Sequence, residues 1–260
     1  MDIGNSSGMR IGGPNTVGFV NFHAGIPATF FLPPGEPLRE PGPVAIVPQS
    51  GGFAAYIDEQ ARAAGVHAGW LVATGNEVNI TVTDALAYLV ERLGVTVVAC
   101  FSEAMQDAEA FIEVAVRAEE LDKPLVVLKA GGSDAGQQAV LSHTASIAGS
   151  DDVFSVCRQY GVLRAESLEQ MLDWHKVFQT GQHLRRTRLS ILTGSGGSGV
   201  LMADSASAAG LTVPETPDHD RASIEKLIPA FGSARNPVDV TAQAIAAGIG
   251  QLPGNPEDHA

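Results

Sequence analysis

The chain has 260 residues, 45% of them hydrophobic and 17% charged, which is the composition of a globular protein with a sizeable buried core. A net charge of −13 excludes nucleic acid and an anionic membrane as main partners, because both would repel the protein. The two cysteines, Cys100 and Cys157, do not have the spacing of a metal site, so we expect free thiols, no metal and a cytoplasmic location.

The two ends of the sequence have the composition of cut or frayed segments. Residues 1–9 lack the basic start and apolar stretch of a signal peptide, and residues 250–260 are rich in Pro, Gly and acids. No run approaches the roughly 20 apolar residues that span a bilayer. We therefore expect a piece of a longer protein without a membrane segment.

Short apolar runs alternate with amphipathic stretches along the chain. The apolar runs lie at residues 44–47, 70–73, 95–101, 125–129 and 189–193. Helical patterns lie at residues 54–64, 84–93 and 108–121. This alternation predicts an α/β fold with open parallel sheets and helices on both faces.

Two polar breaks divide the chain. Residues 33–43 contain five prolines, and residues 181–188 contain three arginines. We therefore predict a tail and linker over residues 1–42, one α/β domain over 43–182, and a second over 187–260. The second has few residues for a complete open sheet, so we expect it to be incomplete.

Two glycine-rich turns each follow an apolar run and precede a helix. Ser50, Gly51 and Gly52 follow the first run, and their backbone N–H groups together with the helix dipole favour an anion such as phosphate. An ordinary strand-to-helix turn is the alternative. Residues 194–199 have the G-x-G-x-x-G pattern, with Glu215 further on, so a dinucleotide site is an alternative to a phosphate site there.

His143 lies among small residues after the glycine-rich stretch 131–136. A neutral imidazole in accessible surroundings is a competent nucleophile near neutral pH. Such a group needs a partner that fixes its tautomer, and Glu103, just after the run 95–101, is the candidate. The alternatives are a structural histidine and a solvated acid at a helix start.

Seven motifs in order resemble the nucleoside-diphosphate-forming acyl-CoA synthetases, relatives of succinyl-CoA synthetase. They are residues 10–15, 44–52, Thr74-Gly75-Asn76-Glu77-Val78, Glu103, Ser142-His143-Thr144, residues 195–199 and Asn236-Pro237-Val238-Asp239. The resemblance runs from about residue 10 to 242, and the common order of the motifs is more specific than any one of them.

The resemblance implies two flavodoxin-like domains of the succinyl-CoA synthetase type. It implies that ATP phosphorylates His143, that the phosphoryl group activates a carboxylic acid as an acyl phosphate, and that CoA then forms the thioester. Glu103 would support the phosphohistidine. Ser50, Gly51 and Gly52 at one helix start, and Ser195, Gly196 and Gly197 at another, would hold the phosphate.

The resemblance also implies partners that this sequence does not contain. The family's CoA-binding domain and its ATP-grasp portion, which binds ATP and Mg²⁺, would come from other domains or subunits, so we expect an oligomer. A non-catalytic regulatory module that binds CoA or nucleotide remains an alternative. A dinucleotide-binding domain built on residues 194–199 is another.

Overall fold

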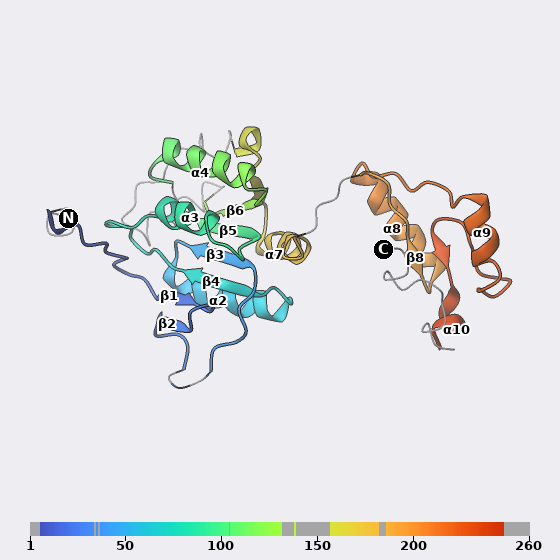
Figure 1. Cartoon of the computed structure of the whole chain (residues 1–260), viewed down its shortest axis with the longest axis horizontal. Coiled ribbons are helices and arrows are strands. Elements are labelled where there is room, and N and C mark those ends of the chain that lie inside the picture. Colours follow the sequence, from blue (N-terminus) through green and yellow to red (C-terminus); the bar gives the residue numbers. More distant parts are fainter. Residues whose placement is uncertain are drawn as a thin grey trace. The chain divides into compact units, whose positions relative to one another are not determined.

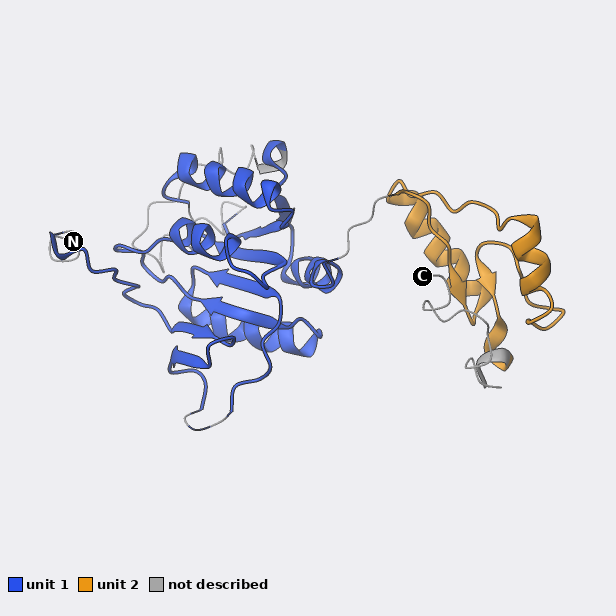
Figure 2. Ribbon diagram, viewed as in Figure 1, with its two compact units in different colours: residues 1–183 blue, residues 184–260 orange. Residues whose placement is uncertain are grey.

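The computed structural model describes residues 6–131 except 34, 36 and 104, then residue 138, residues 157–181 and residues 186–246. The chain divides into two compact units, Met1–His183 and Leu184–Ala260 (Figures 1 and 2). Each unit is described by itself below.

The first unit is built on one seven-stranded sheet. Its strands are β1 (Gly18–Asn21), β2 (Ile26–Thr29), β3 (Val44–Pro48), β4 (Ala68–Val72), β5 (Val97–Ser102), β6 (Leu125–Lys129) and β7 (Leu163–Ala165), in the spatial order β2-β1-β4-β3-β5-β6-β7. The strands from β4 to β7 are parallel. Counted along the chain, these five have the order 2-1-3-4-5 of flavodoxin-like proteins. The predicted fold class is therefore confirmed.

Helices cover both faces of this sheet. They are α2 (Gly51–Ala63), α3 (Val82–Val90), α4 (Ala108–Glu120) and α7 (Leu168–Phe178), with a 3₁₀ turn, η1, at Cys157–Tyr160. Along β3, Ala45 and Val47 face α3 and α4, whereas Val44 and Ile46 face α2 and α7. This two-sided burial explains why the strands are continuous apolar runs in the sequence.

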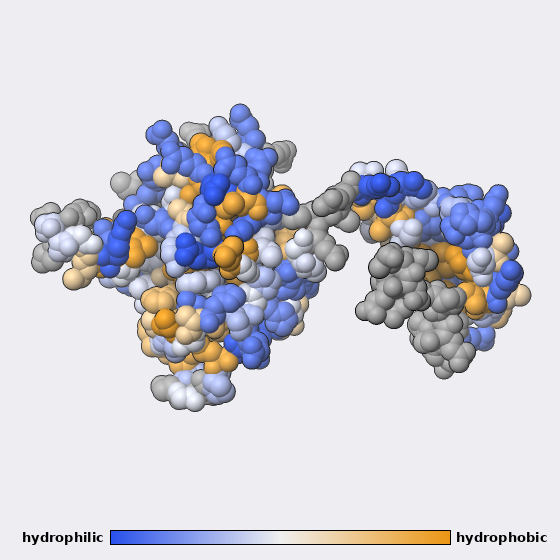
Figure 3. Space-filling view, in the orientation of Figure 1, coloured by the Kyte–Doolittle hydropathy of each residue, from blue (hydrophilic) through white to orange (hydrophobic). Residues whose placement is uncertain are grey.

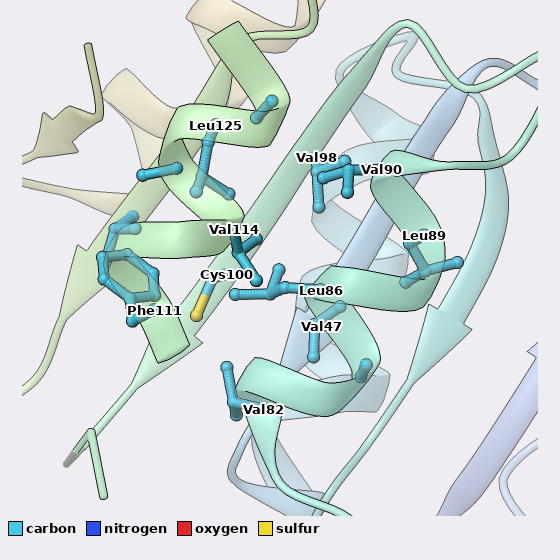
Figure 4. Close-up of a cluster of buried hydrophobic side chains, with 14 of the residues drawn as sticks. Val47, Val82, Leu86, Leu89, Val90, Val98, Cys100, Phe111, Val114 and Leu125 are labelled. Carbon is cyan, nitrogen blue, oxygen red and sulfur yellow. The ribbon is translucent and has the colours of Figure 1, made fainter. Parts of the chain in front are cut away.

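The cluster beneath α3 and α4 shows how the helices are fixed to the sheet (Figure 4). Leu86 of α3 and Phe111 of α4 are almost fully buried beside Val47 and Cys100 of the strands. Thr81 begins α3 with a capping box, in which its hydroxyl accepts from the N–H of Asp84 and the Asp84 carboxylate accepts from the N–H of Thr81. The cap and the apolar face together determine where the loop before α3 ends.

The N-terminal segment belongs to the same sheet. The sequence indicated only a tail and linker before residue 42, whereas β1 and β2 form a hairpin in which β1 pairs antiparallel with β4. The segment before β1 packs on the loop after β4, where the Pro14 carbonyl accepts from the N–H of Asn76 at 2.9 Å. Gly75 has φ +68°, and a Cβ there would lie 2.4 Å from the Pro14 oxygen. This contact requires glycine.

The second unit contains β8 (Leu192–Thr193), α8 (Gly196–Ala208), α9 (Asp218–Ile224), β9 (Val238–Asp239) and α10 (Thr241–Ala246). β8 and β9 pair in parallel. Val200, Leu201 and Met202 of α8 are exposed, and Figure 3 shows hydrophobic surface on this unit. Among the described helices of both units, none is long and apolar enough to cross a membrane.

His175 of α7 is a buried histidine whose ring faces the core. It is 1% exposed, and its Nδ1 hydrogen-bonds the Met171 carbonyl. Its Nε2 has no hydrogen-bond partner within the described part of the chain. Burial lowers the pKa of His175 to about 4, although the bond to Met171 acts in the opposite direction.

We expect the stability of the first unit to depend on pH through His175. Between the unfolded pKa of about 6.5 and the folded value of about 4, the unfolded chain binds more protons, so stability falls as the pH falls. The loss amounts to about 3 kcal/mol once the pH is below both values. Urea unfolding followed by tryptophan fluorescence reports this unit, because Trp70 and Trp174 both lie in it. A His175→Leu variant with the same pH dependence as the wild type would contradict this prediction.

We also expect Gly75→Ala to destabilise the first unit. The left-handed backbone costs a side-chain-bearing residue about 1–2 kcal/mol, and the contact with Pro14 adds to this cost. Gly52→Ala is the matched control, because Gly52 is helical and no described atom lies within 4 Å of the added Cβ. That variant should be neutral or gain up to about 1 kcal/mol. Equal urea midpoints for the two variants would show that the contact at Gly75 does not matter.

Candidate functional site

The carboxyl ends of β3 and β5 lie side by side where the strand order reverses. The chain goes from β3 to β4 on one side and then crosses to β5 on the other. Directly after β3, the N–H of Gln49 donates to the carbonyl of Phe101 at 2.9 Å. Open α/β sheets bind ligands in the crevice at such a switch point. The loops that meet here carry Ser50 and Glu103, two residues that the sequence predicted for the site.

The start of α2 offers backbone N–H groups at this edge. Ser50 is the N-cap residue, with an extended backbone and no side-chain capping hydrogen bond. Gly51 is half-buried, because a Cβ there would lie 3.3 Å from the Asn15 oxygen and 3.3 Å from the Val17 nitrogen. Gly52 is exposed, and a Cβ added there would have no described atom within 4 Å. An anion at this helix start would therefore approach from the side of Gly52.

A buried glutamine joins Glu103 to the start of α2. The Gln49 side chain is 4% exposed, and its Oε1 accepts from the N–H of Glu103 at 2.7 Å and from the Ser102 hydroxyl at 3.3 Å. Since Gln49 immediately precedes Ser50, this amide holds Glu103 beside the helix start. The structure thus brings together two parts of the predicted site, Glu103 and Ser50 to Gly52.

Glu77 is a buried acid at the same edge whose role sequence reasoning missed. It is 6% exposed and accepts from the Thr74 hydroxyl at 2.8 Å, the Val82 N–H at 3.0 Å and the Gln106 amide at 3.2 Å. Burial raises its pKa, whereas the hydrogen bonds from Thr74, Val82 and Gln49 oppose this rise. Because buried polar groups need hydrogen-bond partners, these three donors hold the carboxylate of Glu77 in place at the edge of the sheet.

The signal for Glu77 was present in the sequence but weak. It ends the Gly75-Asn76-Glu77 turn after a buried strand, and its φ of +54° is uncommon for a residue with a side chain. A single acid in a turn is usually solvated, so only the contacts of Glu77 identify it as part of the site.

The second predicted phosphate site lies at the start of α8 in the other unit. Ser195 is the N-cap and has no side-chain capping bond, and Gly196 and Gly197 are exposed. A Cβ on Gly196 would lie 3.1 Å from Oδ2 of Asp239. A phosphate at this helix end would therefore meet the like charge of Asp239 on one side, and the approach past Gly197 is electrostatically preferable.

Other contacts bear on the dinucleotide alternative for this turn. Gly199 packs closely on the end of β8 and on the residue before β9, since a Cβ there would lie 3.2 Å from Thr193 and 3.1 Å from Pro237. The exposed Glu215, which that alternative assigns to a ribose, lies 3.8 Å from the Arg235 guanidinium. The G-x-G-x-x-G pattern thus has a packing explanation at its last glycine, and the dinucleotide site stays a prediction.

His143 and its loop, residues 139–156, lie outside the described residues, and so does most of the glycine-rich stretch before it. The assignment of His143 therefore stays a prediction. Within the described residues, no group of three His, Cys, Asp or Glu side chains is arranged to hold a metal ion.

Comparison with known proteins gives matches to both units. Residues 41–178 match the succinyl-CoA ligase like flavodoxin domain, and residues 189–248 match the Ligase-CoA domain. The alpha subunit of ADP-forming acetate–CoA ligase II from Pyrococcus furiosus is 33% identical over 94% of this chain and 52% of that protein. The ADP-forming 4-hydroxybutyrate–CoA ligase of Nitrosopumilus maritimus is 30% identical over 94% of this chain and 35% of that protein.

A solved structure agrees with these matches. The dinucleotide forming acetyl-coenzyme A synthetase 1 of Ca. Korarchaeum cryptofilum, in complex with phosphate and ADP, has a TM-score of 0.80 and 32% identity. It is matched over 92% of this chain and 51% of its own length. The chain thus spans about half of this structure and of the Pyrococcus furiosus subunit, and 35% of the Nitrosopumilus maritimus ligase. The resemblance inferred from the motifs is confirmed, and the chain belongs to the succinyl-CoA ligase-like flavodoxin domain family.

Proposed function

We propose that this chain is part of a nucleoside-diphosphate-forming acid–CoA ligase and that it carries the phosphoryl group on His143. The observation that carries the proposal is the position of Glu103, which Gln49 holds beside the start of α2 at the switch point of the sheet. The relatives named above are ADP-forming ligases of acetate and of 4-hydroxybutyrate, which supports a carboxylic acid as the substrate.

The proposed reaction has three steps. A ring nitrogen of His143 attacks the γ-phosphorus of ATP, and the bond to the leaving ADP oxygen breaks. The phosphoryl group then passes to an oxygen of the substrate carboxylate, which regenerates the histidine and gives an acyl phosphate. Finally the CoA sulfur attacks the acyl carbon, and inorganic phosphate leaves as the thioester forms.

Residues of both units have distinct roles in this proposal. The N–H groups at Gly51 and Gly52 and the dipole of α2 stabilise the dianionic phosphoryl group. Glu103 accepts a hydrogen bond from the N–H of the far nitrogen of His143, which fixes the tautomer and strengthens the attacking nitrogen. Ser195, Gly196 and Gly197 at the start of α8 provide the second phosphate-binding helix end.

The remaining components of the complete enzyme come from other domains or subunits. We assign ATP and Mg²⁺ to an ATP-grasp partner and CoA to a CoA-binding domain, so the active form is an assembly that we place in the cytoplasm. The proposal keeps residues 187–260 as one part and joins residues 1–42 to 43–182 as the other, because β1 pairs with β4 in the same sheet.

We expect Mg-ATP and an ATP-grasp partner to phosphorylate this chain at His143. The modified residue can be mapped by mass spectrometry under alkaline conditions, which preserve phosphohistidine. The phosphate should be absent in His143→Ala and present in His219→Ala, a control at a histidine whose side chain is 81% exposed. No modification in the presence of a partner that binds would favour the non-catalytic regulatory module.

We further expect Glu103→Gln to slow phosphorylation of His143 by about 10- to 100-fold, the usual effect of losing a partner that orients a reactive histidine. The variant keeps the backbone N–H that Gln49 binds, so the loop should stay in place. Single-turnover phosphorylation measures the rate, and a melting curve of the same variant shows whether it has lost stability. A wild-type rate in Glu103→Gln would remove Glu103 from the site.

A further inference from the structure

Glu77 is a buried carboxylate to which the proposed phosphoryl transfer assigns no role. Thr74 and Val82 donate to its Oε1 at 2.8 and 3.0 Å, and Gln106 donates to its Oε2 at 3.2 Å. The loop that carries Glu77 is also bonded to Gln49, because the N–H of Gly75 donates to the Gln49 carbonyl at 2.9 Å. Burial raises the pKa of Glu77, and the Gln49 side-chain amide acts on the acid itself by opposing this rise. Glu77 lies in the loop that joins β4 to α3, at the edge of the sheet where the parallel strands end.

Three hydrogen-bond donors and the nearby Gln49 amide match the acceptor capacity of a carboxylate. An ionised carboxylate has about four lone-pair sites and no donor, whereas an amide replaces one oxygen by an NH₂ group. Burial and the charge of Asp84 disfavour ionisation of Glu77, and Arg10 lies 3.9 Å from Asp84 on its exposed side. The N–H groups of Val82 and Gln106 nevertheless require an acceptor at Glu77, and a glutamine there would set its NH₂ group against the Gln106 amide.

The amide of Gln49 has one orientation that satisfies its neighbours. Its Oε1 accepts from the N–H of Glu103 and from the Ser102 hydroxyl, so its NH₂ group is turned toward Glu77. A rotation of the amide by half a turn would place NH₂ against the Glu103 N–H. Glu77, which accepts hydrogen bonds, thus selects the orientation that holds Glu103.

We propose that Glu77 is a positioning residue of the phosphoryl-transfer site and that it acts through Gln49 on Glu103. The inference rests on the proposed function, since it assigns Glu77 to the same site. Gln49 also directly precedes Ser50, so the same amide sets the distance between Glu103 and the start of α2. A buried acid that touches no substrate can in this way control the rate of His143 phosphorylation.

The test exchanges the acid at position 77 and the amide at position 49. The full chain, with Mg-ATP and an ATP-grasp partner, is compared as wild type, Glu77→Gln, Gln49→Glu and the double variant. Each single variant should phosphorylate His143 about 10- to 100-fold more slowly than the wild type. The double variant restores one donor facing one acceptor, and Gln106, which is exposed, can turn its amide. It should recover most of the wild-type rate.

Asp58→Asn provides the matched control. Asp58 is 6% exposed, the same fraction as Glu77, and it pairs with Arg39 on a part of α2 away from the edge. The substitution also turns a buried carboxylate into an amide. It should lower the melting temperature and leave the phosphorylation rate at the wild-type value, because a general loss of stability does not move Gln49.

The outcomes separate this inference from the proposed function. An unphosphorylated wild type contradicts the proposed function itself. A phosphorylated wild type with Glu77→Gln at the same rate, or a double variant that folds and remains slow, overturns only the role of Glu77. If Glu77→Gln does not fold, Gln49→Met tests the same link, because it removes the acceptor of the Glu103 N–H; a wild-type rate in that variant also overturns the inference.

Discussion

The parallel pairing of β3 with β5 brings Gln49 and Glu103 together, because it aligns Pro48 with Phe101 at the ends of the two strands. Gln49 continues this ladder by donating its N–H to Phe101, and its side chain then reaches the N–H of Glu103. The helices α2 and α7 cover one face of these strands and α3 and α4 cover the other, so a one-residue slip would move every side chain into the wrong part of the core. The hydrophobic core thereby fixes the geometry of polar groups that it does not contact.

The edge is an arrangement of acceptors and donors in low-dielectric surroundings. Gln49 is 4% exposed and Glu77 is 6% exposed, so each unpaired polar atom there would cost about 1–3 kcal/mol. The hydrogen bonds that Gln49 Oε1 accepts from the Glu103 N–H and the Ser102 hydroxyl leave one consistent orientation for the buried amide. Such a network holds Glu103 in a fixed position, which its proposed role as the partner of His143 requires. Gly52 remains exposed beside it, where an anion could bind.

The two glycine-rich helix starts are chemically different although their sequences are alike. At α2, the backbone of Asn15 lies against Gly51, and the described residues leave the space beside Gly52 open, so an anion there meets the N–H donors directly. At α8, the carboxylate of Asp239 lies beside Gly196. The first helix end is thus better suited to a dianion at close range, and the second favours an approach along Gly197.

The sequence by itself determined the parallel sheet, its apolar strands and the family. Strands that are buried on both faces appear as continuous apolar runs, and the order of the motifs can be read directly along the chain. It also placed Ser50 and Glu103 at strand ends. The β1–β2 hairpin was not predicted, since its membership of the sheet depends on pairing with β4, far along the chain. The link from Glu77 through Gln49 to Glu103 was decided only by the tertiary structure. Gln49 and Glu103 are 54 residues apart, and their contact exists because strand register and a left-handed turn at Glu77 bring three separate loops together.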